Sequence, residues 1–174
     1  MFKRIILLLS IFLLCSCSFK SDYFTLYVDD YSFTVGYDNI EYLKYTFDLD
    51  VEDTIDTNQT IKDINVYSFD KLFCKVDIEN LKDKTINSDD AIISKLTLYC
   101  LDVGDRTYKI NDTVLDESVT SDCSKFNGNL IKKNGYACII EKQDKDKMSV
   151  IELHGDILNL NQDKLDHIVI YVVR

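Results

Sequence analysis

The sequence predicts a mainly β protein, an antiparallel β-sandwich with at most one or two short helices; a partly closed barrel is the alternative. Only two of the 174 residues are alanine, the best helix former, and Asp outnumbers Glu by 24 to 6. Asp favours turns and caps, whereas Glu favours helix interiors. At least eight short runs with strand patterns follow one another, with turn signals between them and no helical crossovers. With 46% apolar residues, the chain has the length and composition of one globular domain.

The first residues form a targeting segment. Lys3 and Arg4 give a positive head, and residues 5–14 form an apolar run that only Ser10 interrupts. At about 1.5 Å per residue, a helix of this length cannot cross a hydrocarbon layer of about 30 Å. The pattern is typical of a signal peptide that is removed on export.

The apolar run ends in Leu14-Cys15-Ser16-Cys17, which resembles the lipobox of bacterial lipoproteins. An aliphatic residue, two small residues and a cysteine stand in the order of that motif, and the resemblance covers residues 1–17 only. It implies that Cys17 is lipidated, becomes the N-terminus and anchors the protein on the extracytoplasmic face of the cell membrane. An ordinary secretory signal with two incidental cysteines is the alternative.

The same resemblance implies a division of the chain. Residues 1–16 are removed, residues 17–22 are the lipidated cysteine and a short tether, and residues 23–174 form a single β-rich extracytoplasmic domain. Loss of Lys3 and Arg4 leaves 18 basic and 30 acidic side chains, a formal charge of −12. A charge of this sign repels nucleic acid and anionic lipid headgroups. We therefore expect no nucleic-acid partner, and we expect the lipid to hold the protein at the membrane.

The clearest element of the domain is a hairpin over residues 23–36. A two-residue turn at Asp29-Asp30 places Leu26 opposite Phe33, within a face of apolar pairs. Register and side pattern agree, which is typical of a half-buried antiparallel pair.

Alternation with a period of two predicts the further strands, and turn residues separate them. In order, the runs are residues 43–52, 72–79, 96–100, a short strand around Tyr108, 130–131 joined to 136–141 through Asn134-Gly135, 148–153 and 167–173. The last run is apolar on both faces, which indicates a central position in its sheet. Spacings of four and three between Val119, Cys123 and Phe126 predict one short helix over residues 117–126.

Four cysteines remain for structure in the exported chain: Cys74, Cys100, Cys123 and Cys138. An even number in such a domain predicts disulfides, and no Cys-x-x-Cys spacing indicates a zinc or redox site. Of three possible connectivities we favour Cys74 with Cys100, on apolar strand faces, and Cys123 with Cys138, around a predicted hairpin. Buried free thiols that act as small hydrophobic side chains are the alternative.

His154 and His167 are the only histidines, and either is a candidate general base because His titrates near neutral pH. Asp156, beside His154, would complete the pair that an envelope hydrolase uses. No nucleophile elbow, HExxH helix, Gly-rich phosphate loop or catalytic-Cys motif accompanies them. We therefore expect structural or surface roles for both histidines and assign no catalytic residue.

Asp48, Asp50 and Glu52 are weak candidates for a Ca²⁺ site. They alternate along one predicted strand, and carboxylate oxygens are the ligands that Ca²⁺ prefers. Same-face neighbours on a strand lie about 7 Å apart, however, so one strand cannot surround a cation. A solvated strand face is the expected interpretation, and we expect neither a metal nor a cofactor.

Together these patterns predict a lipid-anchored, disulfide-stabilised β domain outside the cell, a binding or envelope-structural module without catalysis. Its ligand or protein partner is not readable from the sequence. An envelope hydrolase that uses His154 with Asp156 or His167 is the rival hypothesis. A Ca²⁺-dependent adhesin-like module is the third, and the acidic run at residues 48–52 is the feature that would distinguish it.

Overall fold

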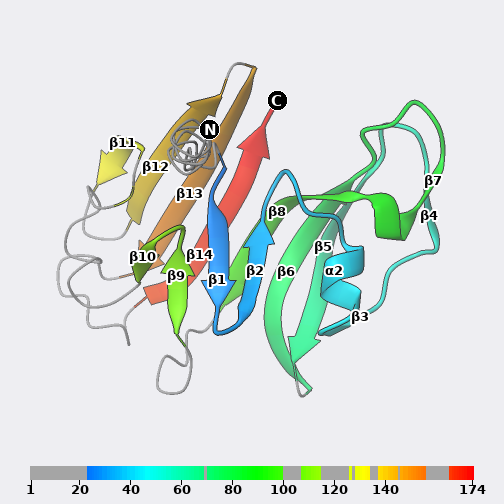
Figure 1. The fold of residues 1–174 in the computed structure, drawn as a ribbon, viewed down its shortest axis with the longest axis horizontal. Helices are drawn as coiled ribbons and strands as arrows, with labels where there is room; N and C mark the ends of the chain where they lie inside the picture. The colour runs from blue at the N-terminus through cyan, green and yellow to red at the C-terminus, as the bar shows by residue number, and fades with distance from the viewer. Residues whose placement is uncertain are drawn as a thin grey trace, which may run out of the picture.

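The computed structural model describes residues 23–68, 70–99, 107–114, 126, 128–133, 137–144, 146–155 and 165–174. In chain order its elements are β1 (Thr25–Val28), β2 (Tyr31–Thr34), α2 (Glu41–Lys44), β3 (Asp48–Leu49), β4 (Thr54–Ile55), β5 (Thr60–Ser68), β6 (Lys71–Glu79), β7 (Ile86–Asn87), the 3₁₀ turn η1 (Ser88–Asp90), β8 (Ile92–Tyr99), β9 (Tyr108–Ile110), β10 (Thr113–Val114), β11 (Asn129–Lys133), β12 (Ala137–Asp144), β13 (Lys147–Gly155) and β14 (Leu165–Val173). The described chain is thus mainly β, as the sequence predicts (Figure 1).

All pairs among the described strands are antiparallel, and these strands form three sheets. The small sheet has the order β10-β9-β1-β2, the large sheet has the order β11-β12-β13-β14-β8-β6-β5-β3, and β4 pairs with β7. The edge strands of the large sheet, β11 and β3, do not pair with each other, so the sheet is open rather than closed into a barrel. The sandwich prediction is therefore the better of the two alternatives.

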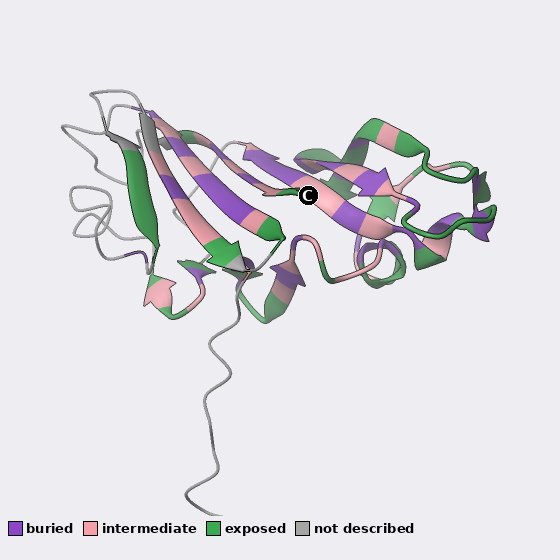
Figure 2. Ribbon diagram, turned by 90° about the horizontal axis from the view of Figure 1, so that it is seen from above, coloured by how far each residue is buried: buried purple, intermediate pink, exposed green. Residues whose placement is uncertain are grey.

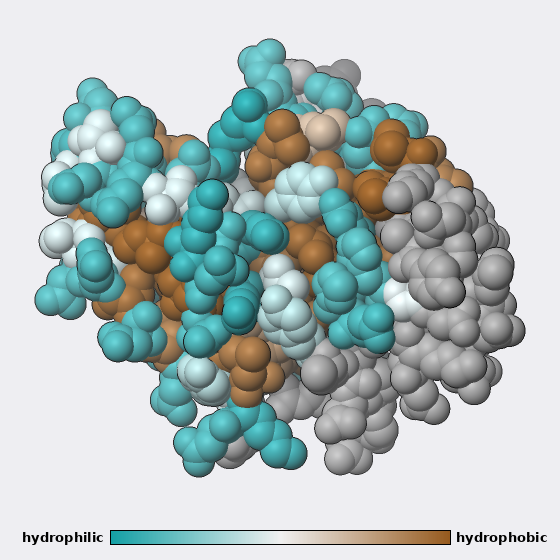
Figure 3. Space-filling model, turned by 180° about the vertical axis from the view of Figure 1, so that it is seen from behind, coloured by the Kyte–Doolittle hydropathy of each residue, from teal (hydrophilic) through white to brown (hydrophobic). Residues whose placement is uncertain are grey.

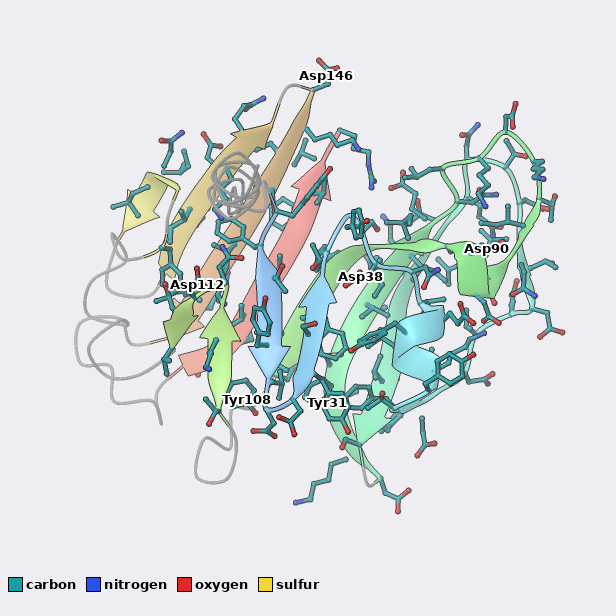
Figure 4. The ribbon with its side chains drawn as sticks, viewed as in Figure 1. Tyr31, Asp38, Asp90, Tyr108, Asp112 and Asp146 are labelled. Carbon is teal, nitrogen blue, oxygen red and sulfur yellow. The ribbon has the colours of Figure 1, made fainter. Side chains whose placement is uncertain are left out.

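The predicted hairpin is confirmed in its register. Leu26 lies opposite Phe33, and both side chains are fully buried. On the other side of β1, strand β9 pairs so that Val28 has Tyr31 on one side and Tyr108 on the other. Figure 4 shows these two tyrosines at the same end of the small sheet. The hairpin therefore supplies one central strand, β1, and one edge strand, β2, of a four-stranded layer.

The small sheet packs over one face of the large sheet, and the core lies between them (Figures 1 and 2). The backbone N–H of Phe24, just before β1, donates to Ser149 Oγ of β13 over 3.2 Å, which links the two layers. Buried and more exposed residues alternate along the long strands in Figure 2. A fully buried aliphatic or aromatic side chain contributes about 1.5–3 kcal/mol, so this shared core holds the sandwich together. Its largest fully buried members include Phe24, Phe33, Leu96, Leu98, Ile110 and Ile140.

Gly36, just after β2, marks a close approach of the two layers. Its φ of +89° lies in the left-handed region, which favours glycine. A Cβ at this position would collide with Cγ2 of Val172 on β14. The N–H of Gly36 donates to the carbonyl of Ile93 on β8 over 2.7 Å. Only a residue without a side chain fits here.

The prediction of a central last strand is confirmed. Strand β14 lies between β13 and β8 in the large sheet. Ile168 and Ile170 are fully buried in the core, whereas His167, Val169 and Tyr171 on the opposite face are partly exposed. The strand therefore presents one apolar face to the core and a mixed face to solvent.

The prediction of a strand over residues 43–52 is wrong for most of its length. Residues Glu41–Lys44 form helix α2, and only Asp48–Leu49 pair as a strand. The N–H of Phe47 donates to the carbonyl of Leu43 over 2.9 Å, which extends the helical turn. The buried residues Ile40, Leu43 and Phe47 are spaced by three and four, which is a helical spacing. The apolar residues of this segment also fit the period of two of a strand, and burial against the core selects the helix.

Strand β6 is confirmed, but its predicted face is wrong at one end. Cys74, Val76 and Ile78 are buried as predicted, whereas Leu72 is 40% exposed and Phe73 is buried instead. A register shift between β5 and β6 at this point exchanges the two faces. Strand β5, which pairs along β6, was not among the predicted strands, although its buried Ile64 and Val66 alternate with exposed neighbours.

Other predictions fall partly or wholly outside the described residues. The helix predicted over 117–126 lies outside them except for Phe126, which is buried. Strands β11 and β12, on either side of the predicted Asn134-Gly135 turn, do pair antiparallel. Among the described residues, no helix is long and apolar enough to cross a membrane.

The disulfide prediction can be followed at one cysteine. Cys74 is a free thiol, fully buried on β6, and burial raises its pKa well above the usual range. Leu98, not a cysteine, lies directly opposite it on β8. Cys100 and Cys123 lie outside the described residues, as does the side chain of Cys138. At Cys74 the alternative of a small buried hydrophobic side chain matches the structure, and the two pairings stay predictions.

Candidate functional site

The outer face of the large sheet, which we define as the face turned away from the small sheet, carries the candidate site. Polar side chains cover much of this face, with apolar patches between them (Figure 3). Strands β13, β14, β8 and β6 line an open hollow of about 550 Å³ there. Its charged and titratable lining residues are Asp77, Glu79, Lys95, Glu152, His154 and His167.

Strand register brings the two histidines together. His154 on β13 lies directly opposite His167 on β14, and His167 lies directly opposite Tyr99 on β8. Because side chains alternate along a strand, Ile151 and Leu153 point into the core while His154 points out. Three ring-bearing residues that are far apart in the sequence therefore form one row across the sheet.

Glu152 is the hydrogen-bonding centre of the hollow. Its Oε2 lies 2.8 Å from Nε2 of His154, and its Oε1 accepts a hydrogen bond of 3.0 Å from the Tyr171 hydroxyl. The side chains of His154 and Glu152 are 30% and 22% exposed. Burial, together with the hydrogen bond to Glu152, raises the pKa of Tyr171 to about 12. Tyr171 is therefore a neutral hydrogen-bond donor over the physiological pH range.

The two imidazole rings stack on each other. Their centroids are 4.4 Å apart and their planes meet at 9°. The ring of Tyr99 follows at 6.1 Å from His167. Burial and the neighbouring His154 lower the pKa of His167, while Asp166 and Glu152 act in the opposite direction. His167 is thus biased towards its neutral form.

The arrangement does not assemble a metal centre. Two imidazoles and a carboxylate are a ligand set for transition metals, but the nitrogen lone pairs lie in the ring planes. In a parallel stack these lone pairs do not converge on one point. Within the described ranges, no three or more His, Cys, Asp or Glu side chains form a group that could hold a metal ion.

The weak Ca²⁺ candidates lie elsewhere, at the edge of the large sheet. Asp48 and Asp50 line a second open hollow of about 530 Å³ together with Lys44 and Tyr67. Only Asp48 belongs to a strand, so these acids and Glu52 do not share one strand face as predicted. Lys44, whose ammonium pairs with Asp89, brings a positive charge to this hollow. The arrangement gives no support to the adhesin hypothesis.

The structure gives His154 a different carboxylate from the one that the sequence suggested. Asp156 lies outside the described residues, and Nε2 of His154 lies against the carboxylate of Glu152. The two residues share a face because they are two positions apart on one strand. The signal in the sequence was the pattern Glu-x-His, which begins inside the predicted strand 148–153 and which the prediction did not use. Tyr171 and the pairing of the two histidines required knowledge of the strand order.

The fold and the site define a class: an open antiparallel β-sandwich with a polar, histidine-containing hollow on the outer face of its larger sheet. No protein family, curated protein or solved structure matches this chain. The functional argument therefore depends on the residues themselves.

Proposed function

We propose that this protein is a lipid-anchored binding module of the bacterial cell envelope, held at Cys17 and presenting the outer-face hollow to a polar ligand. The hollow with its Glu152-centred hydrogen bonds is the observation that carries the binding part of the proposal. The lipobox-like residues carry the anchoring part.

The chemistry of the hollow supports the binding of a polar ligand. Glu152 fixes His154 on one side and Tyr171 on the other, so these groups are preorganised as hydrogen-bonding partners. Preorganised groups lose little conformational entropy when a ligand binds, which favours recognition.

The tether limits where the ligand can be. Five residues, 18–22, separate Cys17 from the first described residue, and at about 3.4 Å each they span about 20 Å at most. A lipidated Cys17 would hold the domain close to the membrane surface. The ligand is then a component of the envelope that lies near the membrane.

Replacing Cys17 by serine is expected to move the protein from the membrane fraction to the aqueous fraction, because the acyl chains are lost. Each buried CH₂ of such a chain contributes about 0.8 kcal/mol to membrane binding, so several chains anchor firmly. Fractionation of bacteria that express the full chain, with labelled palmitate, measures the change. Cys15→Ser is the matched control and should stay labelled and membrane-bound. If the Cys17→Ser protein kept its label, the anchoring proposal would be wrong.

Ligand binding is tested in the membrane-anchored protein with a photo-crosslinking amino acid. At Val169, which lines the hollow, we expect a reproducible crosslinked product. At Tyr45, which is 81% exposed at the end of α2 and does not line the hollow, we expect none. The same product should be lost when Val169 carries the crosslinker and Glu152 is replaced by Gln. A product that forms equally at both positions, or at neither, would contradict the proposed hollow.

A further inference from the structure

We propose that His154 and His167 form a coupled proton switch that sets the charge of the outer-face hollow. This inference rests on the proposed function, because a change of charge regulates the protein only if the hollow binds a ligand. It concerns the regulation of that site, and it is independent of which ligand the site takes.

The coupling follows from the geometry of the pair. The rings are held face to face at 4.4 Å by directly opposed positions on β13 and β14. An imidazolium at this distance from a second imidazolium is repelled by it, and because both side chains are only partly exposed, water screens this repulsion incompletely. The two rings therefore do not take up their protons independently.

The two rings are not equivalent. His154 has a counter-ion, because Glu152 lies against its Nε2 and is held in place by the hydroxyl of Tyr171. The ring of His167 instead contacts the rings of His154 and Tyr99. The positive charge of a proton on His154 is thus compensated by the carboxylate of Glu152. A proton on His167 is instead repelled by His154 when that ring is charged.

The charges around the pair come from every strand packed beside it. On the described parts of these strands they are Glu152 on β13, Asp166 and Tyr171 on β14, Lys95 and Tyr99 on β8, Lys75, Asp77 and Glu79 on β6, and Glu141 on β12. Of the charged residues that line the hollow, three are acidic and one is Lys95. With both histidines neutral the hollow carries a net charge of −2, and with both protonated the net charge is zero. Acidification therefore weakens the attraction of the hollow for a cationic ligand group and favours an anionic one.

The test is an NMR titration of the two histidine ring signals in the full chain, in detergent micelles and without ligand. Only two histidines are present, so His154→Asn leaves the His167 signal alone. In the wild-type protein we expect His167 to titrate below the usual value of about 6.5. In His154→Asn its midpoint should move to higher pH, because the neighbouring charge is gone. In Asp166→Asn it should move to lower pH, because the carboxylate of Asp166 raises the pKa of His167.

The opposite directions of these two shifts separate a proton switch from a structural role, since local loosening would move the midpoint the same way in both variants. Asp166 lies at an exposed position, so its replacement should leave the packing of the two rings unchanged. An unchanged midpoint in His154→Asn, or shifts of the same sign in His154→Asn and Asp166→Asn, would overturn the proposal. The titration needs no ligand. If the two histidines titrate as a coupled pair but Val169 gives no crosslinked product, the proposed binding function is wrong and the proton switch is retained.

Discussion

Replacing Phe47 by alanine is expected to reduce the free energy of unfolding by about 3–5 kcal/mol, the usual cost of deleting a large buried aromatic side chain. Phe47 is 7% exposed, and its ring stacks on Phe73 with centroids 4.7 Å apart and an angle of 8°. Phe33 and Tyr31 contact the same ring at 5.9 and 5.7 Å. The cavity would open between α2 and both sheets, where backbone relaxation cannot fill it. Urea unfolding of the purified domain, followed by circular dichroism, measures the loss.

Tyr45→Ala is the matched control for this prediction. Tyr45 precedes Phe47 by two residues and is 81% exposed, so its loss should change stability by no more than about 0.5 kcal/mol. The comparison also distinguishes the two structures considered for this segment. In a strand over residues 43–52, Tyr45 and Phe47 would share a face and similar burial. Equal losses in the two variants would therefore argue for the strand and against α2.

Replacing Asn80 by alanine is expected to cost about 1–3 kcal/mol for each buried hydrogen-bonding group that is left without a partner. Asn80 is 1% exposed, at the end of β6. Its Nδ2 donates to the carbonyls of Ile55, Asp56 and Lys84 over 3.1, 3.0 and 2.7 Å. Its Oδ1 accepts from the N–H of Lys82 over 2.8 Å. One side chain thus joins the β4–β5 connection to the β6–β7 loop.

Alanine at this position keeps the backbone but supplies none of these hydrogen bonds. Hydrogen exchange of the amide of Lys82 should accelerate along with the loss of global stability. Asn65→Ala, at an exposed position in the middle of β5, is the control and should leave both measurements nearly unchanged. If Asn80→Ala and Asn65→Ala were equally stable, the assignment of Asn80 as a structural crosslink would be wrong.

Predictions from the sequence held where the local pattern and the tertiary contacts agree. The hairpin is such a case, because the Asp29-Asp30 turn, the apolar pairs and the burial of Leu26 and Phe33 all require the same register. The position of β14 is another, because its run of apolar residues predicts a strand between two hydrogen-bonded neighbours, and β14 does lie between β13 and β8, although its outer face is partly exposed.

The errors fall where one segment carries two patterns. Leu43 and Phe47 fit a period of two and also a helical spacing of four. Their burial against Phe33 and Phe73 selects the helix, and that contact depends on strands that are distant in the sequence. The exchange of Leu72 and Phe73 at the bulge in β6 has the same origin, since a bulge is set by the pairing with β5.

The sequence by itself determined the mainly β class and the hairpin at residues 23–36, and it predicts a lipid anchor at Cys17. It placed His167 at the start of the last strand and His154 just after the preceding one, but left them unrelated. Only the tertiary structure decided that the two rings stack and that Glu152 connects Tyr171 to His154. The physical reason is that alternation along a strand fixes which face a side chain takes. Which side chains meet across strands depends on sheet order and register, which the buried core sets as a whole.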